Sequence, residues 1–572
     1  MTNRFLTRLR EMSRLNFMLT CIICLAVLQL LIHFTLIGRG IDFIISRVTL
    51  DDTYYYLQTA WNMWVYGFPT FDGINSTNGV QFLWFWLLVV LASIVPSKYA
   101  LLLLSLMLCA LLNLLGYFAI WRMHRQIGHP VMIFIAVCSW FYLMARFPYY
   151  LTAMENSLHA FFFWWLLLQT MMVIEDVQGG KPIGKRFVAT TVLAVLTVWT
   201  RLDSAIYIAA LYLYLEWYLL NHMAYRKLAR RLTAFMSPVL LLSAVVLFLG
   251  YYYMGGSFVP VSGLVKSDQV VLNQDIFKWL IKSLIRGFRL TFPVEYWRLF
   301  IRQPDGFFPP LAGEEVIGPF TIGALVLIVL MGYRLKGNPL LKQLLDNHQS
   351  HVDLKRFRGL YVTLLLASAL YIVYYSSGGI NSTYAVWYLS PFFVFCLITE
   401  ALVVEKLLDR LPAAYQNMFR IIAVGMMLIT CLGLTFASFY HLVGTPHNSG
   451  EQYTRIAVAR WMRENTKPET IFAAWNAGSL CFLSDRRVIN LDGLINNNEY
   501  YQSVLIAAKI SPELYEQRLL NYLNEKQVTF VIDNQSFIPA GLKTIYTLKK
   551  VFPITGGTGA IGVYENPFIN LP

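Results

Sequence analysis

A series of long apolar segments limits what this chain can fold into. Twelve such segments lie near residues 17–38, 80–96, 99–121, 131–148, 156–174, 187–203, 204–220, 233–253, 319–333, 359–375, 388–404 and 420–440. A helix of about 20 apolar residues is long enough to cross the hydrocarbon core of a bilayer. Only 14% of the residues are charged, against roughly a quarter in soluble proteins. The sequence therefore predicts an α-helical polytopic membrane protein and excludes a soluble enzyme.

The formal net charge of +14 has two interpretations. A basic chain can bind nucleic acid, but a membrane protein also accumulates Lys and Arg in the loops that it keeps in the cytoplasm. We expect no nucleic-acid partner. Arg4, Arg8, Arg10 and Arg14 precede the first segment, which is too long for a signal-peptide core and has no clear cleavage site. It predicts an uncleaved first membrane helix with a cytoplasmic N-terminus.

The loop charges then predict the topology. The connectors that carry clusters of Lys and Arg should all be cytoplasmic; they are 122–130, 175–186, 221–232, 334–358 and 405–420. Twelve full crossings contradict this pattern, because residues 80–121 must make one net crossing. The segment 80–96 is short and begins with Trp84 and Trp86, which favour the membrane interface. We therefore expect an interfacial or dipping helix at 80–96, eleven spans and a C-terminus outside.

The tail differs in composition from the rest of the chain. Charged residues return after residue 445, and the apolar runs shorten to strand length. We expect an amphipathic helix and turn in ARWMRENTKPET, buried strands in TIFAAW and VTFVID, and a helix over 512–526. The sequence thus predicts two parts, a membrane domain over 1–445 and a small extracytoplasmic α/β domain over 446–572.

Two adjacent acids, Asp51 and Asp52, stand in the first outer loop before a run rich in Tyr and Trp. One interpretation is structural: either acid caps the helix that follows. The other is chemical: a carboxylate at the membrane surface can act as a general base on a hydroxyl or hold a metal ion. No cofactor is required by the sequence, and a divalent cation remains an open alternative.

Four more charged residues lie on the predicted outer side. Arg201 and Asp203 stand at a hinge between two spans, where they either pair with each other or line a cavity. Glu155 opens a span and either caps it or serves a site. Lys266 follows a loop with Gly and Pro, where it is either solvated or faces a phosphate.

The signatures of soluble catalytic sites are missing from the sequence. It has no Walker A motif, no GxGxxG entering a helix, no HExxH and no convincing Ser/His/Asp pattern. The Gly-rich stretches GGSF, SGGINS and GGTG are expected to be loops. Six of the seven cysteines lie in apolar runs, so no disulfide framework is visible.

Several segments, taken in order, resemble motifs of GT-C fold glycosyltransferases, and in particular of bacterial enzymes related to polyprenyl-phosphate arabinofuranosyltransferases. These segments are LDDTYYY with NSTNGVQFLWFWLL, LTAMENSLHAF, LTVWTRLDSA, YYMGGSFVPVSGLVK, SGGINSTYAVWYLSP and AAWNAGSLCFLSDRRVINLDGLINN. The chain departs from the family at Asn381, where an acid often stands.

The resemblance implies an enzyme that moves a hexose or pentose from a polyprenyl-phosphate donor to a glycan, lipid or protein acceptor by one inverting displacement. Asp51 would deprotonate the acceptor, and Asp52 would orient it or share a cation. Lys266 and Arg201 would bind the donor phosphate. Glu155, Asp203 and Tyr54 would bind the acceptor or support residues that do. The enzyme would lie in the inner (plasma) membrane, with its bilayer as a partner, and serve cell-envelope glycan biosynthesis.

Three other functions remain open at this stage. A transferase or ligase of the same fold would move a whole oligosaccharide, and a secondary transporter would also carry charges among its spans. Against a transporter, the sequence shows no inverted repeat, and its acids gather in outer loops rather than at the midplane. A membrane scaffold without activity is the third.

Overall fold

The computed structural model describes residues 2–127, 152–268, 357–377, 390–412, 450–554 and 559–569, with single positions between 137 and 141 and between 415 and 432. The predicted span at 319–333 and Asn381 lie outside the described residues. The same holds for most of the predicted spans at 131–148 and 420–440.

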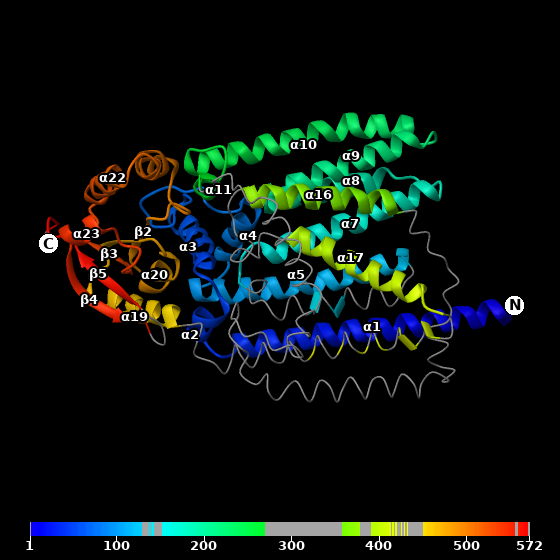
Figure 1. The fold of residues 1–572 in the computed structure, drawn as a ribbon, viewed down its shortest axis with the longest axis horizontal. Coiled ribbons are helices and arrows are strands. Elements are labelled where there is room, and N and C mark those ends of the chain that lie inside the picture. Colours follow the sequence, from blue (N-terminus) through cyan, green and yellow to red (C-terminus); the bar gives the residue numbers. More distant parts are fainter. Residues whose placement is uncertain are drawn as a thin grey trace.

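The larger part of the molecule is a bundle of helices that lie roughly side by side, with the N-terminus at one end and the C-terminal domain at the other (Figure 1). Its elements are α1 (Thr2–Ile37), α2 (Ile41–Phe43), η1 (Ile44–Val48), α3 (Asp51–Tyr66), α4 (Phe82–Ala92), α5 (Lys98–Ile127), α7 (Asn156–Gln178), α8 (Gly184–Thr200), η3 (Leu202–Ser204), α9 (Ala205–Asn221), α10 (Arg226–Gly255), α11 (Val261–Asp268), α16 (Arg358–Ser377) and α17 (Ser390–Asp409).

Several of these helices have the length and apolarity of membrane spans. Among the described residues, four helices qualify by length and composition, or five if the bent pair Ile22–Ile37 and Ile41–Val48 is one span. Helix α10 is the plainest case, because only 11% of its most apolar window is buried within the protein. Exposed side chains such as Phe235 and Leu241 then need a lipid environment. A helical membrane protein is thus supported, whereas the predicted count of eleven spans is not confirmed.

Helix α4 bears on the predicted interfacial segment at 80–96. It has 11 residues and therefore extends for about 17 Å, roughly half of the hydrocarbon thickness. Its side chains are apolar on all sides, and Trp84 and Phe85 are fully buried. The helix is too short to cross a bilayer, which agrees with the prediction that this segment does not span.

The C-terminal part contains a five-stranded sheet in the order β2-β1-β3-β5-β4. The first three strands are parallel, and β5 and β4 are antiparallel to their neighbours. The helix, turn and strands expected in this region are confirmed, as is its mixed α/β character. Its elements are α19 (Gly450–Asn465), β1 (Ile471–Ala474), α20 (Gly478–Ser484), β2 (Arg487–Asn490), α21 (Asn498–Tyr500), η6 (Tyr501–Leu505), η7 (Ile506–Lys509), α22 (Pro512–Glu525), β3 (Phe530–Asn534), α23 (Ala540–Ile545), β4 (Thr547–Pro553) and β5 (Ala560–Glu565).

The sheet domain and the bundle share one apolar core. Side chains of α3 and α4 belong to the same buried cluster as side chains of α19, α20 and β1. Tyr54 of α3, for example, packs its ring at 4.9 Å from that of Phe482 in α20. The domain therefore lies directly on helix α3 of the bundle, as Figure 1 shows for α3 and α20.

The two parts also meet through their backbones at Gly79. A Cβ atom built on Gly79 would lie 2.0 Å from the carbonyl oxygen of Leu494, so no larger residue fits without moving the C-terminal domain. We predict that Gly79→Ala lowers the free energy of unfolding by about 1–3 kcal/mol, the usual cost of overpacking. It should also speed proteolysis at the junction. Thermal unfolding in detergent and limited proteolysis measure the two effects.

Gly184→Ala is the matched control, because a Cβ atom there meets nothing within 4 Å. Equal unfolding midpoints for the two variants would show that the contact at Gly79 does not hold the domain.

Candidate active site

A small cavity lies where helix α3, the loop between α3 and α4, the segment before α7, helix α11 and the C-terminal domain meet. It is lined by Asp52, Tyr55, Tyr56, Gly79, Val80, Gln81, Met154, Glu155, Ser262, Lys266 and Leu494. Two carboxylates and one ammonium group thus face a space bordered by two tyrosines. Three of the predicted site residues, Asp52, Glu155 and Lys266, are brought together here.

Asp52 stands in the first turn of α3, where the positive end of the helix dipole favours a negative charge. Burial nevertheless raises the pKa of its carboxyl above the ordinary value. The cation of Lys266 lowers that pKa, and the charges of Asp51 and Glu155 raise it. The result is a carboxylate that binds a proton more readily than an exposed one, which is the property a general base needs.

Asp51 points to the C-terminal domain instead. Its carboxylate accepts hydrogen bonds from the backbone N–H of Gly478 at 2.9 Å, from the backbone N–H of Ser479 at 2.8 Å and from the Ser479 hydroxyl at 2.8 Å. The approach requires a glycine, because a Cβ atom on Gly478 would lie 2.2 Å from the Asp51 carbonyl oxygen. The interpretation of Asp51 as the cap of its own helix is wrong: α3 has no side-chain cap, and Asp51 serves the start of α20.

Glu155 is held by a buried arginine. Arg201 donates to Glu155 Oε1 at 2.6 Å and to Asp203 Oδ2 at 2.7 Å, and it lies 3.1 Å from the Tyr375 hydroxyl. Tyr371 also donates to Asp203 at 3.1 Å. The predicted Arg201–Asp203 pair is confirmed. Glu155 precedes α7 but makes no cap hydrogen bond, so its interpretation as a simple cap is wrong.

The backbone before Glu155 is fixed by neighbouring helices. Thr53 donates its hydroxyl to the carbonyl of Thr152 at 2.5 Å, and the Trp84 indole donates to the carbonyl of Ala153 at 3.1 Å. Ala153 has φ of 56°, in the left-handed region that a residue with a side chain rarely adopts. These contacts hold a strained turn that directs Glu155 into the cavity.

Lys266 is positioned by Asn78, which the motif analysis did not single out. The Asn78 amide donates to the carbonyls of Tyr251, Ser257 and Val259 at 2.9, 2.9 and 3.2 Å. Its oxygen accepts the backbone N–H of Val261 at 2.9 Å, the first residue of α11. One buried amide thus fixes the loop between α10 and α11 and, with it, the helix that carries Lys266.

The C-terminal domain supplies Asp492. Tyr55, which lines the cavity, donates its hydroxyl to Asp492 at 3.3 Å, and Asn490 donates to the same hydroxyl at 3.2 Å. The pKa of Asp492 is raised to about 7, mainly because the carboxyl is buried. The hydrogen bond from the backbone N–H of Leu494 lowers this pKa, and the negative charge of Asp52 raises it. Asp492 belongs to the segment AAWNAGSLCFLSDRRVINLDGLINN, but the sequence alone did not indicate that it lies beside Tyr55 of α3.

The remaining predicted residues lie around the cavity rather than in its lining. Tyr54 shares a hydrogen bond of 2.5 Å with Thr49 and packs against α20. Arg201 and Asp203 lie behind Glu155. Asp51 and Tyr54 therefore belong to the contact with the C-terminal domain.

The donor set in the cavity does not fit a divalent cation. Within the described part of the chain, no group of three or more His, Cys, Asp or Glu residues is placed to hold a metal ion. The two carboxylates of the cavity share it with Lys266, whose positive charge opposes a second cation. We therefore derive no chemical step through a metal.

A family model for a domain of unknown function (DUF8728) matches residues 444–564, the region of the five-stranded sheet. The comparison with curated proteins found no match.

Solved structures of two enzymes are similar to the chain over nearly its whole length. The oligosaccharyltransferase AglB of Archaeoglobus fulgidus, in complex with an inhibitory peptide and a dolichol phosphate, is 14% identical at a TM-score of 0.46, over 96% of this chain and 75% of that one. ArnT of Cupriavidus metallidurans, bound to undecaprenyl phosphate, is 14% identical at a TM-score of 0.44, over 97% and 99%.

The buried charge cluster leads to a stability prediction. Replacing Arg201 by Met leaves Glu155 and Asp203 buried without a cation, which costs about 3–5 kcal/mol. We expect Arg201→Met to lower the thermal unfolding midpoint strongly. In contrast, Arg460→Met should change it little, because Arg460 pairs with Asp42 on the surface, where both side chains are more than half exposed. Similar midpoints for the two variants would contradict this account.

Proposed function

We propose that this chain is a membrane glycosyltransferase that moves a sugar from a polyprenyl-phosphate donor to a hydroxyl group of a glycan, lipid or protein acceptor. The observation that carries the proposal is the shared cavity of Asp52, Glu155 and Lys266 at the membrane side of the C-terminal domain. In a displacement at a sugar carbon, a carboxylate with a raised pKa can accept the proton of the attacking hydroxyl, and a cation in the same cavity can stabilise the leaving phosphate.

The chemistry needs one proton acceptor and one cation. Asp52 takes the proton of the acceptor hydroxyl while the oxygen of that hydroxyl forms a bond to the anomeric carbon. The bond between that carbon and the phosphate oxygen breaks on the opposite side, so the anomeric configuration inverts. Lys266 stabilises the negative charge that the departing polyprenyl phosphate gains.

We propose Asp52 rather than Asp51 as the base because the carboxylate of Asp51 is already occupied by other contacts. The carboxylate of Asp51 accepts three hydrogen bonds from the start of α20, which hold it away from the cavity. We assign Asp51 the role of positioning α3, and thereby Asp52, against the C-terminal domain. Arg201 is likewise assigned to positioning, because two carboxylates already occupy it.

Glu155 is proposed to bind a sugar hydroxyl. One of its oxygens pairs with Arg201, and the other, Oε2, has no hydrogen-bond partner among the described residues. A buried carboxylate oxygen in that state is costly unless a ligand donates to it. A hydroxyl of the donor or acceptor sugar meets that requirement in the cavity that Glu155 lines.

Dolichol phosphate and undecaprenyl phosphate are the lipids in the similar AglB and ArnT structures. For this chain we propose the same class of lipid donor, on the ground of its apolar helices and of Lys266. The donor sugar is a hexose or a pentose, and the reaction takes place at the outer face of the plasma (inner) membrane, within cell-envelope glycan biosynthesis.

The test measures release of polyprenyl phosphate by the purified protein in lipid nanodiscs, from a panel of labelled polyprenyl-phosphate monosaccharides and lipid-linked oligosaccharides. With the donor that turns over, Asp52→Asn should lower kcat by about 10²–10⁴-fold, because the base is lost. Lys266→Met should lower it by about 10²–10³-fold. Release from oligosaccharide donors alone would favour the second candidate, an oligosaccharide transferase.

Asp42→Asn is the matched control, since Asp42 lies near the same loop but pairs with Arg460 on the surface. It should keep the turnover of the unaltered protein. Asp51→Asn separates the two acids: we expect a lower unfolding midpoint with residual turnover. Full turnover in Asp52→Asn, together with none in a stable Asp51→Asn, would return the base to Asp51.

The pH dependence of kcat/KM is a separate prediction. Asp52 must be ionised to accept a proton, so activity should rise with pH as its carboxyl loses its proton. Because burial raises that pKa, the rise should occur at higher pH than for an exposed carboxyl. Lys266→Met removes a cation that lowers the pKa, so the residual activity should rise at still higher pH, whereas Lys266→Arg should leave the profile in place. An unchanged profile in Lys266→Met would contradict the coupling.

A further inference from the structure

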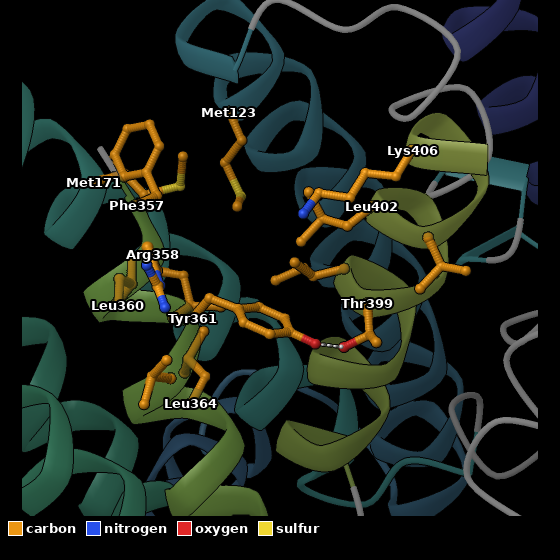
Figure 2. A pocket seen from close by; sticks show the side chains of 14 residues that line it. Met123, Met171, Phe357, Arg358, Leu360, Tyr361, Leu364, Thr399, Leu402 and Lys406 are labelled. Carbon is orange, nitrogen blue, oxygen red and sulfur yellow. Dashed lines mark hydrogen bonds between the residues drawn. The ribbon is translucent and has the colours of Figure 1, made fainter. Parts of the chain in front are cut away.

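A second, larger pocket lies between α5, α7, α16 and α17 and encloses about 600 Å³ (Figure 2). This volume falls within the range of about 300–1,000 Å³ that is usual for small-molecule sites. Lys98, at the start of α5, pairs with Asp485 of the C-terminal domain, and Met123 of the pocket lies about 37 Å farther along that helix. The pocket is therefore at the end of the bundle remote from Asp52.

The wall of the pocket is apolar. Leu360 and Leu364 of α16 face Ile398 and Leu402 of α17, and two methionines from α5 and α7 add side chains that adapt to different shapes. The hydroxyls in the wall bond to each other, since Tyr361 donates to Thr399 at 3.3 Å. A hydrocarbon chain can occupy such a space without breaking a hydrogen bond to the solvent.

The rim of the pocket is basic. Arg358 is the first residue of α16, and Lys406 lies in the last turn of α17, so the two helices bring both cations to the same end. Figure 2 shows them on different sides of the pocket, with the nitrogen of Lys406 extended toward it. Both side chains are exposed, and no acidic residue is among the described residues that line the pocket.

We infer that this pocket binds one anionic phospholipid of the bilayer, with its phosphate between Arg358 and Lys406 and an acyl chain along the apolar wall. Basic pockets between membrane helices select anionic head groups by charge, and the hydrocarbon chain adds the hydrophobic contribution. The loop charges predict that this end is cytoplasmic. A polyprenyl phosphate fits the pocket less well as an occupant, because its proposed reaction takes place at Asp52, at the other end of the bundle.

The experiment uses the full-length protein in phosphatidylcholine nanodiscs and two photo-crosslinking probes, a phosphatidylglycerol and a phosphatidylcholine with the same reactive acyl chain. Labelled peptides are identified by mass spectrometry. We expect the phosphatidylglycerol probe to label α16 and α17 around the pocket at lower concentration than the neutral probe. Arg358→Gln combined with Lys406→Gln should weaken that labelling by about 25-fold, which is about fivefold for each cation.

Two further variants keep the test decisive. Lys185→Gln combined with Lys227→Gln removes two exposed cations outside the pocket lining, each near the first residue of a helix (α8 and α10), and should leave labelling unchanged. Val403→Trp, at an exposed position of the pocket wall, should block labelling while both cations remain.

Equal labelling by both probes, or labelling that the double Gln variant does not reduce, would overturn the proposal. So would displacement of the phosphatidylglycerol probe by equimolar undecaprenyl phosphate, which would name a different occupant. None of these measurements uses turnover, so their outcome is independent of the proposed reaction.

Discussion

The carboxylate of Asp51 is the contact on which the arrangement of the candidate site depends. It joins the first turn of α3 to the first turn of α20, two helix starts that lie more than 400 residues apart in the chain. Each helix start favours a negative charge, and the Asp51 carboxylate lies in the first turn of α3 while it accepts hydrogen bonds from the start of α20. Because Asp52 follows Asp51 directly in the first turn of α3, the direction in which Asp51 points decides which side of the helix faces the cavity.

Charge pairing then divides the remaining residues into those that are satisfied within the protein and those that are left for a ligand. Arg201 neutralises two carboxylates and has no exposed surface to offer. Asp52, Glu155 and Lys266 share a cavity in which one carboxylate oxygen of Glu155 has no partner within the described residues. The buried ion pairs thus support the site from behind. The side chains that line the cavity are the ones that can contact a ligand.

The sequence predicted the elements well where local pattern decides them. Strands β1 and β3, helices α19 and α22 and the short apolar helix at residues 82–92 follow from periodicity and length. Of the seven residues that the resemblance assigns to the site, Asp52, Glu155 and Lys266 line one cavity. The sequence could not distinguish Asp51 from Asp52, because their difference arises from Gly478 and Ser479 in a distant segment. Asn78 and Asp492 lie in segments that the resemblance includes, but their roles were missed for the same reason, since their partners are remote in sequence.

The hydrogen bond between Tyr55 and Asp492 spans 437 residues, which has a consequence for how the protein is made. At roughly 5–20 residues per second, a ribosome needs about 20–90 s to proceed from one residue to the other. During that interval, α3 is already made but lacks the domain that covers it. The cavity is consequently among the last features to form, because part of its lining is synthesised long after the first helices.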